Sequence, residues 1–497
     1  MGARRNDITG TERAQIAIEA MPKHRPYGTI TRLATDHRVS RQTIYNIADA
    51  GEHALRKEME PGQHGPQPKE KAVQVDRNRL ERSTVVLTEA GVSQRDVTLC
   101  LAEILDTKLS SSWVNAQLAK REAIAEEVNR QMQPKARETL SGDEIYSHGN
   151  PNMLVVGNDT LYIYELTRQT SCDGESWGCV LLDVGDTTQF ASDAGTGLAA
   201  GVREAGVAVH QLDWDHLLRP MWGQSTRLEK QAYAVLEKVE ERAHKFDQTK
   251  TEKRLEQHLK AWEKLQSAAD EKLERCDAFQ QIARQVDTQF GMIDLETGEL
   301  RDADTGVALL RKLGAQLQSW EGRIYQKLST NLINWAAGLF SYQTVLSQDL
   351  APLIEQWGAP AIQALCRIWQ IEADEKRHPL PLLIQQNRQN LWCSSFDQAV
   401  DLLELDQLME AWQALTTILN RSWRGSMLAE CVNSLLRPVL AKRKHSDQGC
   451  LELFRLLHNL RPFARGKRAN HSPADLAGLC VPDDPLILLG FDPKVSI

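Results

Sequence analysis

The stretch ETLSGDEIYSHGNPNMLVVGNDTLYIYELTRQ, residues 138–169, is where the chain changes from helical to strand patterning. Its runs NMLVVG and TLYIYEL are rich in β-branched and aromatic residues, and Asn158 and Asp159 separate them, which predicts a hairpin. ETLSGDEIY supplies a candidate strand before this pair. We therefore expect a meander of three strands.

The next 44 or so residues alternate between helix and strand signals. SWGCVLLD and TGLAAGVREAG predict two helices, whereas TQFASD and VAVHQLD predict a fourth and a fifth strand. Three strands in a meander followed by alternating helix and strand describe a mixed five-stranded sheet. This order is that of a ribonuclease H-like domain.

Strand signals then stop for nearly two hundred residues, and residues 225–290 contain neither glycine nor proline. Apolar residues recur at helical spacing there, in one stripe around Leu228 and Val239 and in another around Leu255 and Leu265. DLETGELRD predicts a small hairpin within this region. We expect long amphipathic helices that pack into a bundle, with charged outer faces in solvent.

The first 50 residues contain the helical segments TERAQIAIEAM, TITRLATDHR and RQTIYNIADAGEHAL, the last two separated by a tight turn at VS. This outline predicts a helix-turn-helix, with the alternative of a plain helical bundle. Its core would contain Ile30, Leu33, Ala34, Val39, Ile44 and Ile47. The outer face would offer DNA contacts from Arg41, Gln42, Thr43 and Tyr45.

These patterns predict an α+β multidomain protein with a ribonuclease H-like mixed five-stranded sheet interrupted by a large all-α insertion. The polar segment EPGQHGPQPKEK marks a linker. Residues 79–134 form either a second helix-turn-helix or a packing module. The expected parts are a helix-turn-helix at 1–59, a linker at 60–78, a helical unit at 79–134, the first part of the sheet domain at 135–224, the insertion at 225–420 and the last part of the sheet domain at 421–497.

Composition narrows the class of protein further. No apolar run reaches about 18 residues and the first residues lack a signal peptide's apolar core, so we expect a cytoplasmic protein without a membrane partner. The nine cysteines include no C-x-x-C pair, which argues against a zinc knuckle and favours reduced, mostly buried thiols. Although the net charge is -8, residues 437–470 carry nine Lys or Arg and two acidic residues, a plausible phosphate-binding stretch.

The segment SDAGTGLAAG, residues 192–201, allows two readings. Its three glycines follow a strand and resemble a dinucleotide fingerprint, but the spacing is G-x-G-x-x-x-G and the strand is the fourth of its sheet. The other reading makes Asp193 a metal ligand beside Asp143 on the neighbouring first strand. We favour the metal reading, with the glycines forming the turn into a helix.

A third carboxylate is expected from a helix packed on the sheet, and Glu430 is the best candidate. Ser426 can cap this helix, and Pro438 should kink it or end it early. The expected buried stripe is Leu428, Val432, Leu435, Leu436 and Val439, and the expected polar face is Glu430, Asn433, Ser434 and Arg437. Three carboxylates suit two Mg²⁺ ions, with Mn²⁺ as a substitute, in phosphoryl transfer.

The motifs SGDEIYSHGNPNMLVVGND, ASDAGTGL, QLDWDH and ECVNSLLRPVLAKRKHSDQGCLELFRLLHNLRPFARGKRANHSPADLAG together resemble a DDE transposase of a bacterial insertion sequence, over residues 138–478. The resemblance implies a catalytic, metal-binding triad of Asp143, Asp193 and Glu430. It also implies cleavage of element ends, joining of their 3'-hydroxyls to target DNA, and a homodimer or higher oligomer. Asp213 and His216 resemble a D-x-x-H element, and the helical region resembles an insertion found in such enzymes.

Several alternatives stay open at this point. Glu144 or Asp159 can replace Asp143 as the first ligand, and His216 can be structural or catalytic. Trp423 either stacks on an unpaired base or is a core residue. Expected DNA contacts near Glu430 are Asn433, Arg437, Lys442, Arg443 and Lys444. Other functions for the chain are a catalytically inactive, transposase-derived DNA-binding regulator and, more weakly, a scaffold for protein partners.

Overall fold

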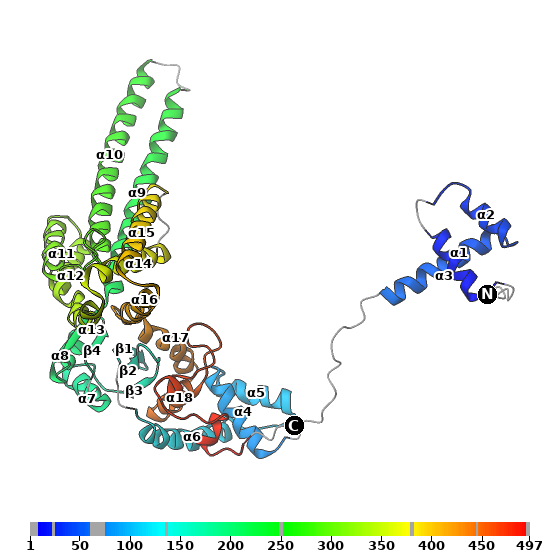
Figure 1. The fold of residues 1–497 in the computed structure, drawn as a ribbon, viewed down its shortest axis with the longest axis horizontal. Coiled ribbons are helices and arrows are strands. Elements are labelled where there is room, and N and C mark those ends of the chain that lie inside the picture. Colours follow the sequence, from blue (N-terminus) through cyan, green and yellow to red (C-terminus); the bar gives the residue numbers. More distant parts are fainter. Residues whose placement is uncertain are drawn as a thin grey trace. The chain divides into compact units, whose positions relative to one another are not determined.

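The computed structural model describes residues 8–21, 25–59, 75–134, 138–185, 187–247, 252–377, 382–443 and 446–493. The chain divides into two compact units, Met1–Gln74 and Val75–Ile497, each with its own buried cores (Figure 1). The boundary falls within the linker expected at 60–78, of which residues 60–74 lie outside the described residues.

The first unit contains three helices around one small core: α1 (Gly10–Ala20), α2 (Thr29–Asp36) and α3 (Arg41–Met59). Thr9 and Glu12 form a capping box at the start of α1. A four-residue turn joins α2 to α3, and the Val39 N–H donates to the Ala34 carbonyl (2.9 Å). The apolar residues expected inside are buried, except that Val39 is only partly so.

The second unit is built on a mixed five-stranded sheet with the order β3-β2-β1-β4-β5, which confirms the predicted sheet. β1 pairs antiparallel with β2, β2 antiparallel with β3, β1 parallel with β4, and β4 parallel with β5. The strands are β1 (Leu140–Ser147), β2 (Asn150–Gly157), β3 (Ile163–Arg168), β4 (Gln189–Ser192) and β5 (Val209–Leu212).

Helices cover both faces of this sheet. One face packs in a single core with α4 (Arg77–Glu89), α5 (Gln94–Leu105), α6 (Ser111–Gln131), α7 (Gly174–Val184) and α8 (Thr196–Glu204). The other face packs against α17 (Met427–Lys442) and α18 (Gln448–Leu460), after which α19 (Pro473–Leu476) and the short helix η1 (Pro485–Leu489) follow. Because α4–α6 share a core with the sheet, residues 79–134 pack as part of this unit.

The all-helical region lies between β5 and α17 in the sequence and has its own core. Its first helix begins at Trp214, eleven residues before the predicted boundary, and pairs with α10 in a long hairpin (Figure 1). The helices are α9 (Trp214–Asp247), α10 (Glu252–Thr288), α11 (Ala303–Gln318), α12 (Arg323–Leu339), α13 (Tyr342–Trp357), α14 (Ala359–Arg377), α15 (Leu382–Leu402) and α16 (Leu405–Asn420). The predicted small hairpin is a turn closed by the bridge Ile293–Leu300.

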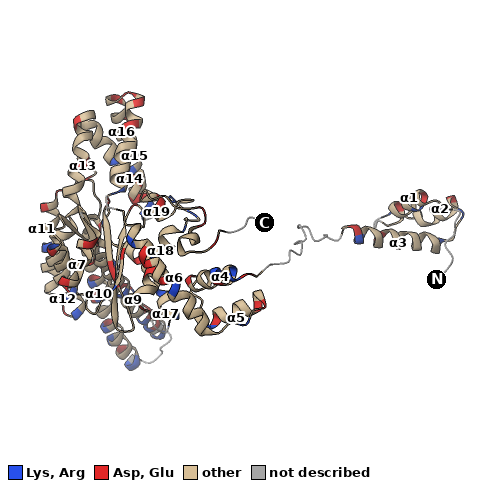
Figure 2. Cartoon of the chain, turned by 90° about the horizontal axis from the view of Figure 1, so that it is seen from below, with Lys and Arg blue, Asp and Glu red and all other residues tan. Residues whose placement is uncertain are grey.

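Charged residues of both signs are intermixed along α9 and α10, as expected for solvated helix surfaces (Figure 2). No helix in the described part of the chain is long and apolar enough to cross a membrane. All nine cysteines are free thiols, but only Cys276, Cys366 and Cys450 are buried, so the expectation that most are buried is wrong.

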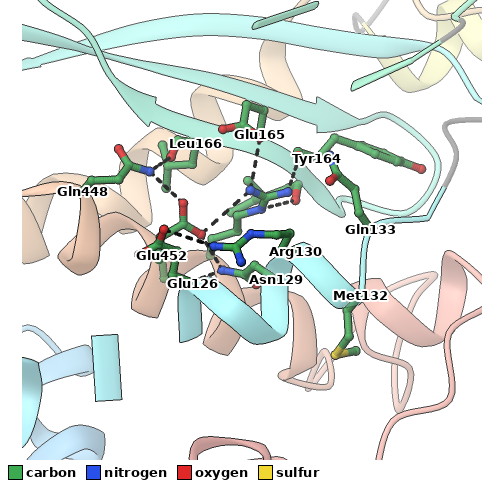
Figure 3. A network of polar contacts seen from close by, with 12 residues as sticks. Glu126, Asn129, Arg130, Met132, Gln133, Tyr164, Glu165, Leu166, Gln448 and Glu452 are labelled. Carbon is green, nitrogen blue, oxygen red and sulfur yellow. Dashed lines mark hydrogen bonds and ion pairs between the residues drawn. The ribbon is translucent and has the colours of Figure 1, made fainter. Parts of the chain in front are cut away.

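Side chains of α18 close the outer edge of the sheet along β3. Asn459 accepts from the Ile163 N–H (2.8 Å), and Gln448 donates to the Leu166 carbonyl (3.0 Å; Figure 3). Arg455 donates to the carbonyls of β3 and is itself buried. An edge strand needs such partners because unpaired N–H and C=O groups invite pairing with another chain. The C-terminal helices are therefore bonded to the sheet that carries the candidate site.

Candidate active site

Asp143 and Asp193 lie side by side where two neighbouring parallel strands stop pairing. The last paired residues of β1 and β4 are Ser141 and Ala191, and each aspartate lies two residues further along its strand. Because side chains alternate across a strand, both carboxylates lie on the same sheet face, the one covered by α17. The strand order predicted from the sequence is what makes them neighbours.

Glu430 lies in the first turn of α17, which packs across β1 and β2. Asn433, one turn further on, is fully buried and its Nδ2 donates to Asp143 Oδ2 at 2.8 Å. This hydrogen bond ties α17 directly to β1. Since residues three apart share a helix face, Glu430 also lies on the side of α17 that faces Asp143.

The pKa of Asp143 responds to the charges of the other two carboxylates. Burial raises the pKa of Asp143 to about 6, and the negative charges of Glu430 and Asp193 add to this shift against the opposing bond from Asn433. The Gly195 N–H donates to Asp193 Oδ1 (2.9 Å) and holds that carboxylate at the strand end. The site therefore concentrates negative charge that a cation would relieve.

The two alternatives for the first ligand lie elsewhere. Glu144 is on the opposite face of β1 from Asp143, and its Oε2 is buried without a hydrogen-bond partner. Burial raises the pKa of Glu144 to about 7, with additions from Asp193 and Asp143. Asp159 lies beyond the far end of β1 and accepts from Trp423 Nε1 (3.1 Å). Of the three, only Asp143 shares a face with Asp193 and a bond with α17.

Asp213 lies directly after β5 and joins three elements. Its Oδ2 accepts from both the N–H (3.0 Å) and the hydroxyl (2.8 Å) of Ser426 at the start of α17, and from His216 Nδ1 (3.0 Å) in α9. Burial would raise the pKa of Asp213, but these bonds outweigh it and hold the pKa below its ordinary value. The bond to Asp213 likewise raises the pKa of His216, aided by the charges of Asp193 and Asp143.

The helix that carries Glu430 differs from expectation in three details. Ser426 is at the N-cap position, but its hydroxyl bonds to Asp213 rather than to the helix. Pro438 lies inside α17 and the helix continues to Lys442, so the expected early end is wrong. Leu435 was expected to be buried and is 57% exposed, whereas Asn433 takes an inward position.

The basic residues near Glu430 do not form one exposed surface. Arg437 is exposed and pairs with Glu430 (Nη2 to Oε2, 3.2 Å), and Lys442 is exposed. Arg443 is buried and bonded to Glu122 of α6, so it is not part of an exposed basic surface. Asn433 is also not exposed, because its amide is buried against Asp143. Lys444 lies outside the described residues.

Other basic residues of 437–470 are also structural. Arg455 is buried at the β3 edge, and Arg468 donates to the carbonyls of Asn158 and Asp159 (2.8 and 2.7 Å). Exposed side chains remain at Arg461, Arg465 and Lys467. The charge count of this segment therefore overstated the surface available to phosphates.

In the first unit, α3 presents the residues expected to contact DNA. Arg41, Gln42 and Tyr45 are exposed, while Ile44 between them is fully buried. Thr43 is half-buried, and its N–H and hydroxyl bond to the Ser40 hydroxyl at the turn (3.1 and 2.8 Å). Thr43 therefore shapes the start of α3, and the other three form an outer face.

Two residues near the site were missed from the sequence. His210 of β5 bonds through Nε2 to the Ser192 hydroxyl (2.8 Å), and burial lowers the pKa of this histidine to about 4. Gly425 lies so close to Asp213 Oδ1 that a Cβ there would be only 2.7 Å away. Trp423, expected either to stack on a base or to lie in the core, is half-buried and bonded to Asp159. Small residues before a helix give no signal that would have singled out Gly425.

The donor set is chemically suited to hard divalent cations, which prefer carboxylate oxygens. Among the described residues, no three His, Cys, Asp or Glu side chains already converge as a closed cation cage. Like charges without a cation repel each other, and Glu430 is paired with Arg437.

Comparisons with known proteins do not supply a family. No protein family model matches the chain, and no curated protein matches it. The function therefore rests on the site and on the resemblance of the motifs described above.

Proposed function

We propose that this chain is a DDE transposase, an enzyme that cleaves the ends of a mobile DNA element and joins their 3'-hydroxyls to target DNA. The observation that carries the proposal is the arrangement of Asp143, Asp193 and Glu430. Asp143 lies within β1 and Asp193 directly after β4, each two residues past the last paired residues of these parallel strands, and Glu430 lies on a helix bonded to β1 through Asn433.

The arrangement of the second unit supports a ribonuclease H-like assignment. Three antiparallel strands are followed by two parallel ones, with the first strand at the centre of the order β3-β2-β1-β4-β5. Helices cover both faces, and the last acidic residue comes from a helix on one face. The long helical region between β5 and α17 then corresponds to the insertion that the resemblance implies.

In this proposal Asp143, Asp193 and Glu430 hold the catalytic metal, for which Mg²⁺ is the natural choice and Mn²⁺ a substitute. When bound, two such ions would activate the attacking oxygen and stabilise the leaving oxygen of an in-line phosphoryl transfer. Asn433 fixes the orientation of the Asp143 carboxylate, and the Gly195 N–H does the same for Asp193. Asp213 orients the His216 ring through its Nδ1, and in this proposal His216 would supply a protonatable group near the carboxylates.

The first unit supplies DNA binding in this proposal. In this proposal the pair α2–α3 with its short turn acts as a helix-turn-helix, in which the second helix enters the major groove. Arg41, Gln42 and Tyr45 would then contact phosphates and base edges. Two element ends require two active sites, so we propose a dimer or higher oligomer on double-stranded DNA.

The test uses the full chain and DNA duplexes that carry the sequences flanking its coding region. With Mg²⁺ or Mn²⁺ the wild type should nick these duplexes and join the 3' ends to a plasmid. Asp143→Asn, Asp193→Asn and Glu430→Gln should each lower the rate at least about a thousandfold while DNA affinity stays unchanged. Asp159→Asn, the matched control at the other end of β1, should keep most of the activity.

The same experiment separates the catalytic proposal from its alternative. Specific binding of the flanking DNA without metal-dependent cleavage would indicate a DNA-binding regulator. Normal cleavage by Glu430→Gln would show that the triad is wrong. A separate variant, Arg41→Ala with Gln42→Ala, should weaken binding to the flanking DNA while leaving nicking of saturating substrate intact.

A further inference from the structure

The short segment that leads into α17 is held on two sides. Residues 423–426, which we call the α17 entry segment, connect α16 to the helix that carries Glu430. On one side they bond to Gln189 of β4 and to Asp213 after β5, and on the other they contact the base of the helical region.

The bonds to the sheet fix the backbone of the entry segment. Gln189 of β4 donates to the Trp423 carbonyl (2.9 Å), and Ser426 donates twice to Asp213 after β5. Between them, Gly425 approaches Asp213 more closely than any side chain would allow. The start of α17 is therefore bonded to the first residue of β4 and to the residue after β5.

Arg424 makes the contact on the other side. Its guanidinium lies over the Phe290 ring, 3.8 Å from the centroid, and donates to the Phe290 carbonyl. Arg377 of α14 lies 4.0 Å from the same ring centroid and pairs with Asp287 of α10 (2.6 Å). Arg424 therefore joins the entry segment to the base of the helical region by a cation–π contact and a hydrogen bond.

Both helices of the long hairpin meet at this point. Phe290 is the second residue after the end of α10, and Trp214 is the first residue of α9. The Trp214 N–H donates to the Arg424 carbonyl (3.2 Å), and its ring packs edge-on against Phe290 with centroids 5.8 Å apart. Arg424 therefore contacts the two ends of the α9–α10 hairpin through its backbone and its side chain.

We propose that Arg424 is a positioning residue that couples the base of the α9–α10 hairpin to the start of α17, and so sets where Glu430 lies relative to Asp143 and Asp193. The inference rests on the proposed function in one respect, which is that Glu430 is a catalytic ligand. It assigns a role to the helical region: displacement of the hairpin base moves the third carboxylate.

The first test measures the coupling without any catalysis. Hydrogen–deuterium exchange of the full chain reports the stability of the backbone amides of residues 429–432 in the first turns of α17. Arg424→Met should speed their exchange by about tenfold, and Arg424→Lys, which keeps the charge over the ring, by clearly less. Unchanged exchange in Arg424→Met would overturn the proposal.

Arg275 provides a matched control within the same helical region. It also lies over aromatic rings, with its guanidinium 5.1 Å from the Tyr325 centroid and 5.4 Å from that of Trp320, and donates to the Glu321 carbonyl (3.1 Å). Arg275→Met should leave exchange at 429–432 unchanged. Equal acceleration in both variants would mean general destabilisation and would overturn the specific role.

The second test uses catalysis and separates the two proposals. In a cleaving enzyme, Arg424→Met should lower kcat about tenfold or more, leave the half-saturating DNA concentration unchanged, and raise the Mn²⁺ concentration needed for half-maximal rate. A raised half-saturating DNA concentration with unchanged kcat would make Arg424 a DNA contact instead. If the wild type cleaves no DNA but exchange responds as stated, the coupling stands and only the proposed function fails.

Discussion

Replacing Asn433 with aspartate tests whether its bond to Asp143 organises the site. The change is isosteric, but it replaces the Nδ2 donor, 2.8 Å from Asp143 Oδ2, by a carboxylate oxygen. Asn433 is buried and Asp143 is half-buried, and the negative charges of Glu430 and Asp193 already act on Asp143. The variant therefore places two carboxylates in contact with no donor between them.

The expected loss of stability has two parts, the repulsion between the two carboxylates and the loss of the hydrogen bond. Two full charges about 4 Å apart repel by about 4 kcal/mol at an effective dielectric constant of about 20, and the lost charge-assisted hydrogen bond contributes about 1.5–3 kcal/mol. The pair can avoid part of this cost by sharing a proton, as closely spaced carboxylates do. We expect Asn433→Asp to lower the free energy of unfolding by about 3 kcal/mol at pH 8.

The pH dependence has a definite sign. A carboxyl pair whose pKa is raised above its unfolded value of about 4 stabilises the folded state at low pH, and that contribution is lost as pH rises through the folded pKa. The difference between Asn433→Asp and the wild type should therefore shrink to about 1 kcal/mol at pH 5. Urea unfolding of the full chain at both pH values, followed by tryptophan fluorescence, measures it.

A swap of the two residues provides the control. Asp143→Asn combined with Asn433→Asp restores one amide and one carboxylate, so the donor–acceptor bond can form in the opposite direction. In the double-mutant cycle we expect a favourable coupling of about 2 kcal/mol at pH 8, without recovery of cleavage. Additive effects, with a coupling below about 0.5 kcal/mol, would refute the role given to this hydrogen bond.

Two further substitutions test other parts of the site. Gly197→Ala would place a Cβ 1.9 Å from the Cys172 carbonyl oxygen and should lower stability by more than about 2 kcal/mol, whereas Gly223→Ala, with open space around it, should be neutral; equal thermal midpoints would contradict this. Asp213→Asn should lower the pKa of His216, because the bond to Asp213 raises it. In the wild type, protonated His216 stabilises the folded state at low pH, and this stabilisation is lost as pH rises through the pKa of His216. The variant should lack this pH-dependent stabilisation. Histidine-selective NMR measures this shift, and an unchanged pKa would argue against the pair.

The sheet and two of the three carboxylates could be predicted because their signals are local. Strand periodicity located all five strands, and the expected order placed the first strand beside the fourth. Because β1 and β4 are parallel neighbours, residues just past their last paired positions lie close together, which brings Asp143 near Asp193. The choice of Asp143 over Glu144 and Asp159 rested on the resemblance. Glu430 required a motif, because nothing in its own helix specifies which strand that helix covers.

The surface near Glu430 was predicted less well because a charge count ignores partners far away in sequence. Arg443 was assigned to DNA, but it is buried against Glu122, more than three hundred residues earlier. Asn433 was also given to DNA, although its partner is Asp143 on the first strand. From sequence alone, a basic or polar residue is expected to be exposed. A partner that lies far away in the sequence becomes known only from the fold.

The junction at Arg424 lies where the chain leaves and re-enters the sheet domain, and the sequence gives no local signal for it. The helical region interrupts the chain between β5 and α17. The end of β5 and the start of α17 must nevertheless lie close together if Glu430 is to meet Asp143. Closing so long a loop has an entropic cost that grows only slowly with its length, so direct bonds at its base can hold it. The structure has such bonds between Asp213 and Ser426 and between Trp214 and Arg424. Because these bonds lie at the base, the position of Glu430 depends on them and not on the length of the hairpin.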